Sequence, residues 1–135
     1  MINNKLLTLF ATVILSGCAA ESAPIQWQAK QISVNKLYQA HLDCDTLPET
    51  GPFQHCTVSF TDLKGNAIDP ASPLIDGGMP LHGHGLPTSP VLTALEKTGT
   101  YRIDGLKYNM SGAWLLGFKI KATQGEDKII FDFVV

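Results

Sequence analysis

The chain has 135 residues, of which 44% are hydrophobic and 16% are charged, and its formal net charge at pH 7 is −2. This length and composition suit one globular domain with its own core, and no low-complexity segment indicates a disordered half. Basic residues are scattered and slightly outnumbered by acidic ones, which argues against a nucleic-acid or polyanion-binding protein.

The N-terminal segment predicts an export signal. Lys5 is followed by an apolar run from Leu6 to Leu15, too short to span a bilayer, and then by the sequence Leu-Ser-Gly-Cys, which ends at Cys18. This arrangement resembles the signal of bacterial lipoproteins, in which the Cys after the cleavage site carries the lipid. We therefore expect residues 1–17 to be a lipoprotein signal peptide and residues 18–24 a lipidated tether. An ordinary cleaved signal that happens to end in Cys would lead to the same compartment.

The residue after Cys18 bears on the choice of membrane. In the resembled lipoproteins an Asp at this position signals retention at the inner membrane, so Ala19 favours the outer membrane of a Gram-negative bacterium, with the protein in the periplasm. Loss of Lys5 leaves nine basic residues against twelve acidic ones. The remainder, residues 25–135, is expected to form a single domain.

Turn signals recur about every eight to twelve residues and the segments between them alternate apolar with polar residues, which is typical of an all-β sandwich or barrel. The first two strands are expected within residues 35–45 and 55–62. With Cys18 assigned to the lipid, Cys44 and Cys56 are expected to form a disulfide across this hairpin in an oxidising compartment. The chain-entropy model gives such a short loop about 3 kcal/mol of stabilisation. Metal ligation by the two Cys is the alternative, but it calls for tighter spacing and a reducing compartment.

The sequence DGGMPLHGHGLP, from Asp76 to Pro87, gathers sulfur and nitrogen donors on a segment that Gly and Pro should keep from forming an ordinary helix or strand. His82 and His84 are separated by one Gly, so in an extended backbone both imidazoles point the same way. Met79 lies close enough for its thioether to join them, and thioether with imidazole favours copper over magnesium or calcium. A Gly/Pro-rich loop whose His residues are merely solvated is the alternative.

The later segments continue the β pattern. Residues 88–99 favour a strand, although Ser89 and Pro90 would also suit the start of a short helix. Residues 99–110 form a further strand region, and residues 113–121 and 127–135 form a hairpin. Met110 falls at a turn, where an apolar side chain is poorly used unless it covers something.

The enzyme classes find little support in the sequence. Both Cys residues of the domain are assigned to the disulfide, and Ser89 and Asp76 are too generic to form a nucleophile and base arrangement with the His residues. No glycine-rich phosphate loop is present in the sequence. His41 and His55 are expected to be structural residues on strands. We therefore expect a protein that is not an enzyme.

The sequences GGMPLHGHGLPTSP and GTYRIDGLKYNMSGAWLLGFKI together resemble the bacterial FixH/YtkA-like proteins, which are small exported or membrane-tethered domains. The resemblance covers residues 36–135. It implies an immunoglobulin-like, CopC-like antiparallel β-sandwich that takes part in copper handling or in the assembly of copper-containing respiratory enzymes. By this motif Met79, His82 and His84 carry the metal, and Met110 is a possible fourth donor.

Two departures from the resembled proteins affect the expected chemistry. CopC-type carriers often bind copper(II) through an N-terminal His, whereas this chain offers Cys18 there, so copper(I) is the expected ion. The transmembrane helix of membrane-embedded relatives is replaced by the lipid. We expect a periplasmic copper-binding domain that transfers or buffers copper, with a copper acceptor or a respiratory-assembly protein as partner. The alternative is a structural lipoprotein that binds a protein partner through its Met/His loop.

Overall fold

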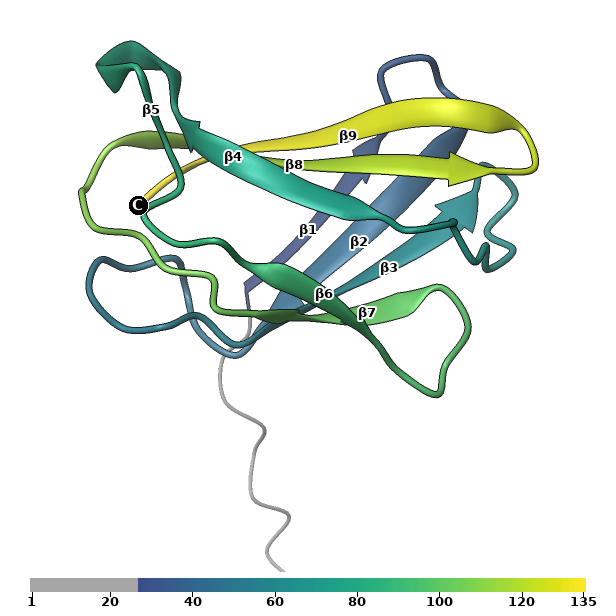
Figure 1. Ribbon diagram of the computed structural model, residues 1–135, viewed down its shortest axis with the longest axis horizontal. Helices are drawn as coiled ribbons and strands as arrows, with labels where there is room; N and C mark the ends of the chain where they lie inside the picture. Colours follow the sequence, from purple (N-terminus) through teal and green to yellow (C-terminus); the bar gives the residue numbers. More distant parts are fainter. Residues whose placement is uncertain (1–26) are drawn as a thin grey trace, which may run out of the picture.

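The computed structural model describes residues 27–135, and the expected signal peptide, the lipidation site at Cys18 and the tether lie outside these residues. The described chain forms two antiparallel sheets that pack as an immunoglobulin-like β-sandwich, as the sequence predicted (Figure 1). Across the first sheet the strands are β1 (Trp27–Ile32), β2 (Tyr38–Cys44), β3 (Cys56–Asp62), β7 (Thr100–Asp104) and β6 (Val91–Ala94). Across the second they are β5 (His84–Gly85), β4 (Leu74–Met79), β8 (Ala113–Ala122) and β9 (Gly125–Val134).

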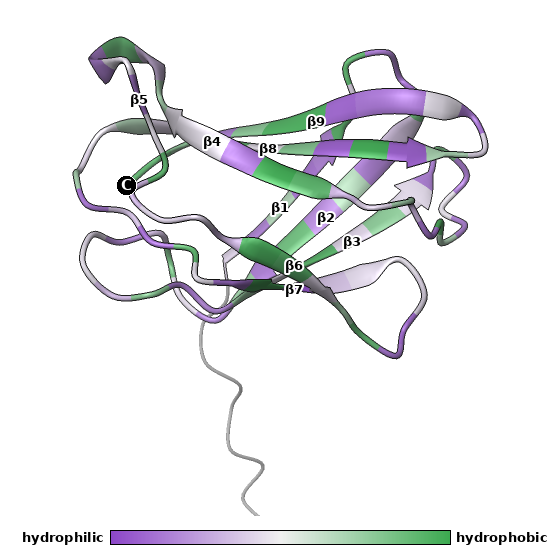
Figure 2. Ribbon diagram, in the orientation of Figure 1, coloured by the Kyte–Doolittle hydropathy of each residue, from purple (hydrophilic) through white to green (hydrophobic). Residues whose placement is uncertain are grey.

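The core fills the space between the sheets because alternate residues of each strand point inward. In β8 the buried positions are Trp114, Leu116, Phe118 and Ile120, which is the face that the sequence predicted. Figure 2 shows the same alternation of hydrophobic and hydrophilic residues along the strands. Each fully buried large apolar side chain contributes about 1.5–3 kcal/mol to folding, so this face anchors β8 firmly between its neighbours.

The predicted disulfide is present. Cys44 and Cys56 lie directly opposite each other in β2 and β3, and both are buried. The loop that they close, residues 45–55, reaches the segment before β8 through isolated bridges at Thr50 and Phe53. The hairpin is therefore tied both by the covalent bond and by backbone contacts at one end of the sandwich.

The segment from Asp76 to Pro87 is more regular than its sequence predicted. Its first part continues the strand β4, which pairs with β8, and only the part after Met79 turns, through the 3-10 helix η1 (Pro80–His82). The prediction that Gly and Pro exclude a strand here is therefore wrong for residues 76–79. The physical reason is close packing of backbones, since a Cβ on Gly77 would collide with the carbonyl oxygen of Leu115 in β8.

Three segments come together at one end of the sandwich, on the left of Figure 1. They are the β4–β5 connection, residues 105–112 before β8, and the C-terminus. Gly112 and Val135 exchange two backbone hydrogen bonds of 2.9 Å, which fixes the second segment to the third. Among residues 27–135, no helix has the length and hydropathy needed to cross a membrane.

Candidate metal centre

Met79 and His84 form a cross-strand pair. Met79 ends β4 and His84 begins β5, and the antiparallel register places the two residues opposite each other. Side chains of such a pair leave the sheet on the same side, with their Cβ atoms roughly 5 Å apart. Met79 is completely buried, and its Cε lies so close to Gly112 that a Cβ there would be only 2.9 Å away. The thioether therefore lies between the β4–β5 connection and the segment before β8.

His84 has an exposed side chain that packs on an aromatic ring. Its imidazole meets the indole of Trp114 edge to face, with the ring centroids 6.0 Å apart and an interplanar angle of 69°. Its Nδ1 lies 3.1 Å from the carbonyl oxygen of Gly85. In the neutral tautomer that carries its hydrogen on Nδ1, this nitrogen donates to the carbonyl and the lone pair of Nε2 is free to bind an ion.

His82 also lies near His84, but its backbone conformation differs from the predicted extended one. It belongs to η1 rather than to an extended backbone, and Gly83, with a φ of 69°, reverses the chain directly after it. The imidazoles of His82 and His84 nevertheless lie 6.0 Å apart between centroids, at an angle of 36°. Since an imidazole nitrogen binds a metal at about 2.0–2.1 Å, rings at this separation can share one ion when their nitrogens face each other.

Met110 contacts Trp114 through its backbone carbonyl. Its side chain is 40% exposed, and its carbonyl oxygen accepts a hydrogen bond of 2.9 Å from Nε1 of the indole. The structure thus brings Met79, His82 and His84 together on one turn, and connects Met110 to them through Trp114. The sequence pattern placed Trp114 on the core face but gave it no part in the site. The signal that could have identified it is its position four residues after Met110 in the resembled motif.

The four proposed ligands carry no negative charge of their own. Within residues 27–135, no three His, Cys, Asp or Glu side chains are grouped so that they could hold a metal ion. An ion held by the four proposed ligands would therefore depend on neutral imidazole and thioether donors. Such a set is poor for calcium and magnesium, which need oxygen ligands, and suits soft ions such as copper(I).

Aromatic rings support Trp114 from behind. Tyr108 packs against the indole with ring centroids 5.1 Å apart, and Phe133 packs against Tyr108 at 5.6 Å. Trp27 extends the row by packing on Phe133 at 4.9 Å. Burial raises the pKa of Tyr108 well above its ordinary value, so its phenol stays neutral. The aromatic surface next to His84 is therefore apolar and uncharged.

Residues 79–85, which carry Met79, His82 and His84, form what we call the Met/His turn. A hollow of about 360 Å³ lies beside this turn, on the outer surface of the second sheet. Gly77, Gly78 and Gly117 contribute only backbone to its lining, and Leu115 and Ile130 add apolar surface. Pro80, Gly83 and His84 reach it from the turn. A molecule in this hollow would therefore touch the turn that carries the two His residues.

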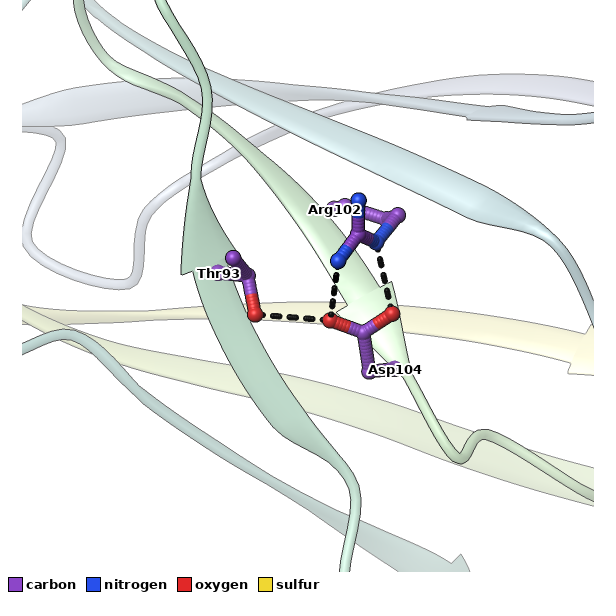
Figure 3. A network of polar contacts seen from close by, with 3 residues as sticks. All are labelled: Thr93, Arg102 and Asp104. Carbon is purple, nitrogen blue, oxygen red and sulfur yellow. Dashed lines mark hydrogen bonds and ion pairs between the residues drawn. The ribbon is translucent and has the colours of Figure 1, made fainter.

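A polar surface cluster outside this region is satisfied by its own members. Asp104 accepts hydrogen bonds from Thr93 at 2.6 Å and from Arg102 at 2.6 and 3.1 Å (Figure 3). Arg102 and Thr93 hold the pKa of Asp104 below its usual range. An exposed pair of this kind adds little to stability, and its carboxylate is already occupied. The two remaining His residues are also apart from the site, since His41 is half-buried in β2 and His55 is exposed just before β3 rather than on a strand.

Comparisons with known proteins give no match, whether with protein-family models, with curated proteins or with solved structures.

Proposed function

We propose that this protein is a lipid-anchored periplasmic domain that binds copper(I) and transfers or buffers it, without chemistry of its own. The observation that carries the proposal is the convergence of Met79, His82 and His84 on one turn, where Met79 and His84 are cross-strand partners and the imidazoles lie 6.0 Å apart. Met110 would complete the ligand set from the neighbouring segment. The resemblance to FixH/YtkA-like proteins supports copper as the metal and the same residues as ligands.

The oxidation state follows from the charge of the donors. Four neutral ligands leave the full charge of the ion uncompensated, and the cost of desolvating an ion rises with the square of its charge. A monovalent soft ion is therefore favoured over a divalent one. Because Met79 is fully buried, the exposed residues 80–85 would have to shift to admit the ion.

The expected lipid anchor would join the domain at the end of the sandwich that carries the Met/His turn. The described chain begins at Trp27, which packs on Phe133, and Phe133 is the register partner of Trp114. A tether that leads to a lipid on Cys18 would thus join the domain at the end that carries the Met/His turn. A membrane-bound copper acceptor or a respiratory-assembly protein would meet this end first.

Competition with a copper(I) chelator tests the function. We expect a soluble chain of residues 21–135 to take up one equivalent of copper(I), and the double variant His82→Ala with His84→Ala to lose it. The double variant His41→Ala with His55→Ala is the matched control, since it removes the same number of imidazoles away from the turn. Equal competition by the wild type and the His82/His84 variant would exclude the proposed site.

A second function, recognition of a protein partner by the same turn, is favoured by one observation. Leu81 lies between the two strands at the tip of the turn and is 86% exposed, and the hollow described above lies beside it. A photo-reactive residue at position 81 separates the two functions in intact cells. A single defined adduct that forms equally with and without a copper chelator would support partner recognition, whereas adducts that require copper would support delivery of the ion.

A further inference from the structure

We propose that Trp114 forms one wall of the cation site, so that the bound ion lies against the indole face beside His84. This inference rests on the proposed copper function and adds to it a residue that the sequence pattern assigned only to the core. It also explains why the site would accept a soft monovalent ion and reject divalent ones.

The contacts of Trp114 connect both sides of the site. Its indole is in edge-to-face contact with the imidazole of His84, and its Nε1–H group donates to the backbone carbonyl of Met110. The buried thioether of Met79 lies against Gly112, two residues before it. Trp114 thus contacts the imidazole of one proposed ligand and the backbone of a second, while the thioether of a third lies against a residue two positions before it.

The exposure of these groups indicates how an ion would reach the indole. Trp114 is completely buried, whereas His84 above it is exposed. His84 belongs to the two-residue strand β5, so a small movement of residues 80–85 would lift the imidazole from the ring and open a space bounded by the indole, the imidazole and the thioether. The negative face of the indole attracts a cation most strongly where water is excluded.

The selectivity of the site follows from the same wall. Tyr108 packs against the indole, with ring centroids 5.1 Å apart, and restricts the space into which the indole could move to admit a hydrated ion. A divalent ion would have to lose its water without gaining an anionic ligand. A copper(I) or silver(I) ion loses less hydration free energy and gains contacts with the indole ring and with the thioethers.

Tryptophan fluorescence tests this proposal directly, because Trp27 and Trp114 are the only two Trp residues of the chain. In the Trp27→Phe variant of residues 21–135, all indole emission comes from Trp114. We expect silver(I) or copper(I), added without oxygen, to quench this emission in proportion to binding, with an end point at one equivalent. Zinc(II) should leave it unchanged. The further changes His82→Ala and His84→Ala should abolish the quenching.

The Trp114→Phe variant is the matched partner, in which only Trp27 reports. We expect its emission to stay constant, and its copper(I) affinity to fall by about tenfold because the weaker ring remains but the Met110 contact is lost. If chelator competition shows stoichiometric binding while Trp114 emission in the Trp27→Phe variant does not change, the wall is disproved and the copper function stands. If chelator competition shows no copper(I) binding, both the role of Trp114 and the copper function are disproved. The quenching measurement keeps Trp114 intact and so does not depend on the folding of the Trp114→Phe variant.

Discussion

Met79 is the residue at which the core and the candidate site coincide. Its side chain is as buried as any in the sandwich, yet its cross-strand partner His84 is exposed. A ligand held in the core does not need to be ordered when the ion binds, which lowers the cost of binding. The same burial means that any change at this position acts on stability as well as on the site.

The two methionines can be separated by Leu substitutions, which keep the apolar volume and remove the sulfur. We expect Met79→Leu to cost less than about 1.5 kcal/mol of stability, because the swap nearly conserves volume. Its copper(I) affinity should fall much more than that of Met110→Leu, whose partly exposed side chain is a peripheral donor. Thermal unfolding and chelator competition on both variants measure the two effects. Wild-type affinity in Met79→Leu would remove Met79 from the ligand set.

Asp127 at the start of β9 controls the turn between β1 and β2 from across the sandwich. Its carboxylate accepts hydrogen bonds of 3.1 Å from the backbone and side chain of Asn35 and one of 2.8 Å from the backbone of Lys128. Burial raises the pKa of Asp127, but these bonds and one from Ser33 outweigh it and hold the pKa below its ordinary value of 3.8. The ionised form is therefore the one that stabilises the fold.

The sign of the pH dependence follows from this lowered pKa. Asp127 stabilises the protein fully above the unfolded pKa of 3.8, and the contribution is lost as the pH falls through the lower pKa of the folded state. We expect Asp127→Asn to lower the free energy of unfolding by about 1–2 kcal/mol at pH 7. Below pH 4 the free energy of unfolding of this variant should depend less on pH than that of the wild type. Urea unfolding at a series of pH values measures both. The exposed Asp132→Asn, on the same strand, is the control, and an equal loss there would contradict the assignment.

At the scale of the elements, the glycines of β4 and β8 have opposite roles although both lie in strand interiors. A Cβ on Gly77 would strike the backbone of β8, whereas a Cβ on Gly117 would meet nothing closer than 3.7 Å. Gly77 is thus needed for the two strands to approach each other. Gly117 leaves the hollow on the outer face open, at a cost in strand stability.

Alanine substitutions distinguish these roles. We expect Gly117→Ala to raise the free energy of unfolding by about 0.5–1 kcal/mol, since Gly in a strand interior is destabilising by that amount. Gly77→Ala should lower it by more than about 1 kcal/mol, because the backbone of β8 must move. Chemical denaturation of the pair measures both changes. A destabilised Gly117→Ala would show that the hollow is more tightly packed than the contacts indicate.

The elements also show what could be predicted from the sequence. Strict alternation revealed β2, β3, β7, β8 and β9, and the Cys residues revealed their disulfide. Strand β4 was missed because two adjacent Gly residues look like a turn unless the facing backbone of β8 is known. Strand β1 was missed because its apolar residues alternate weakly. In the candidate site the sequence names the proposed ligands, whose role stays a prediction. The 3-10 turn that brings the two imidazoles near each other and the position of the Trp114 indole depend on packing between distant segments and could not be read from the sequence.

At the scale of the whole molecule, the disulfide and the proposed metal ligands lie at the same end of the sandwich. The disulfide-closed loop 45–55, the segment before β8 and the Met/His turn all lie there, and the chain enters the domain at the same end through Trp27. The opposite end carries the polar turn that Asp127 holds. Anchoring and binding would therefore act at one end, and folding stability depends on both.

The anchor itself can be tested apart from copper. We expect Cys18→Ser in the full chain to move the protein from the membrane fraction to the soluble periplasmic fraction, because a thiol is needed to carry the lipid. Copper(I) binding by the purified variant should equal that of the wild type, since no proposed ligand is changed. Cell fractionation with immunodetection and chelator competition measure the two results. A Cys18→Ser protein that stays in the membrane fraction would show that something other than a lipid on this residue holds it there, and the domain would then have to contact the membrane or a membrane protein through its own surface.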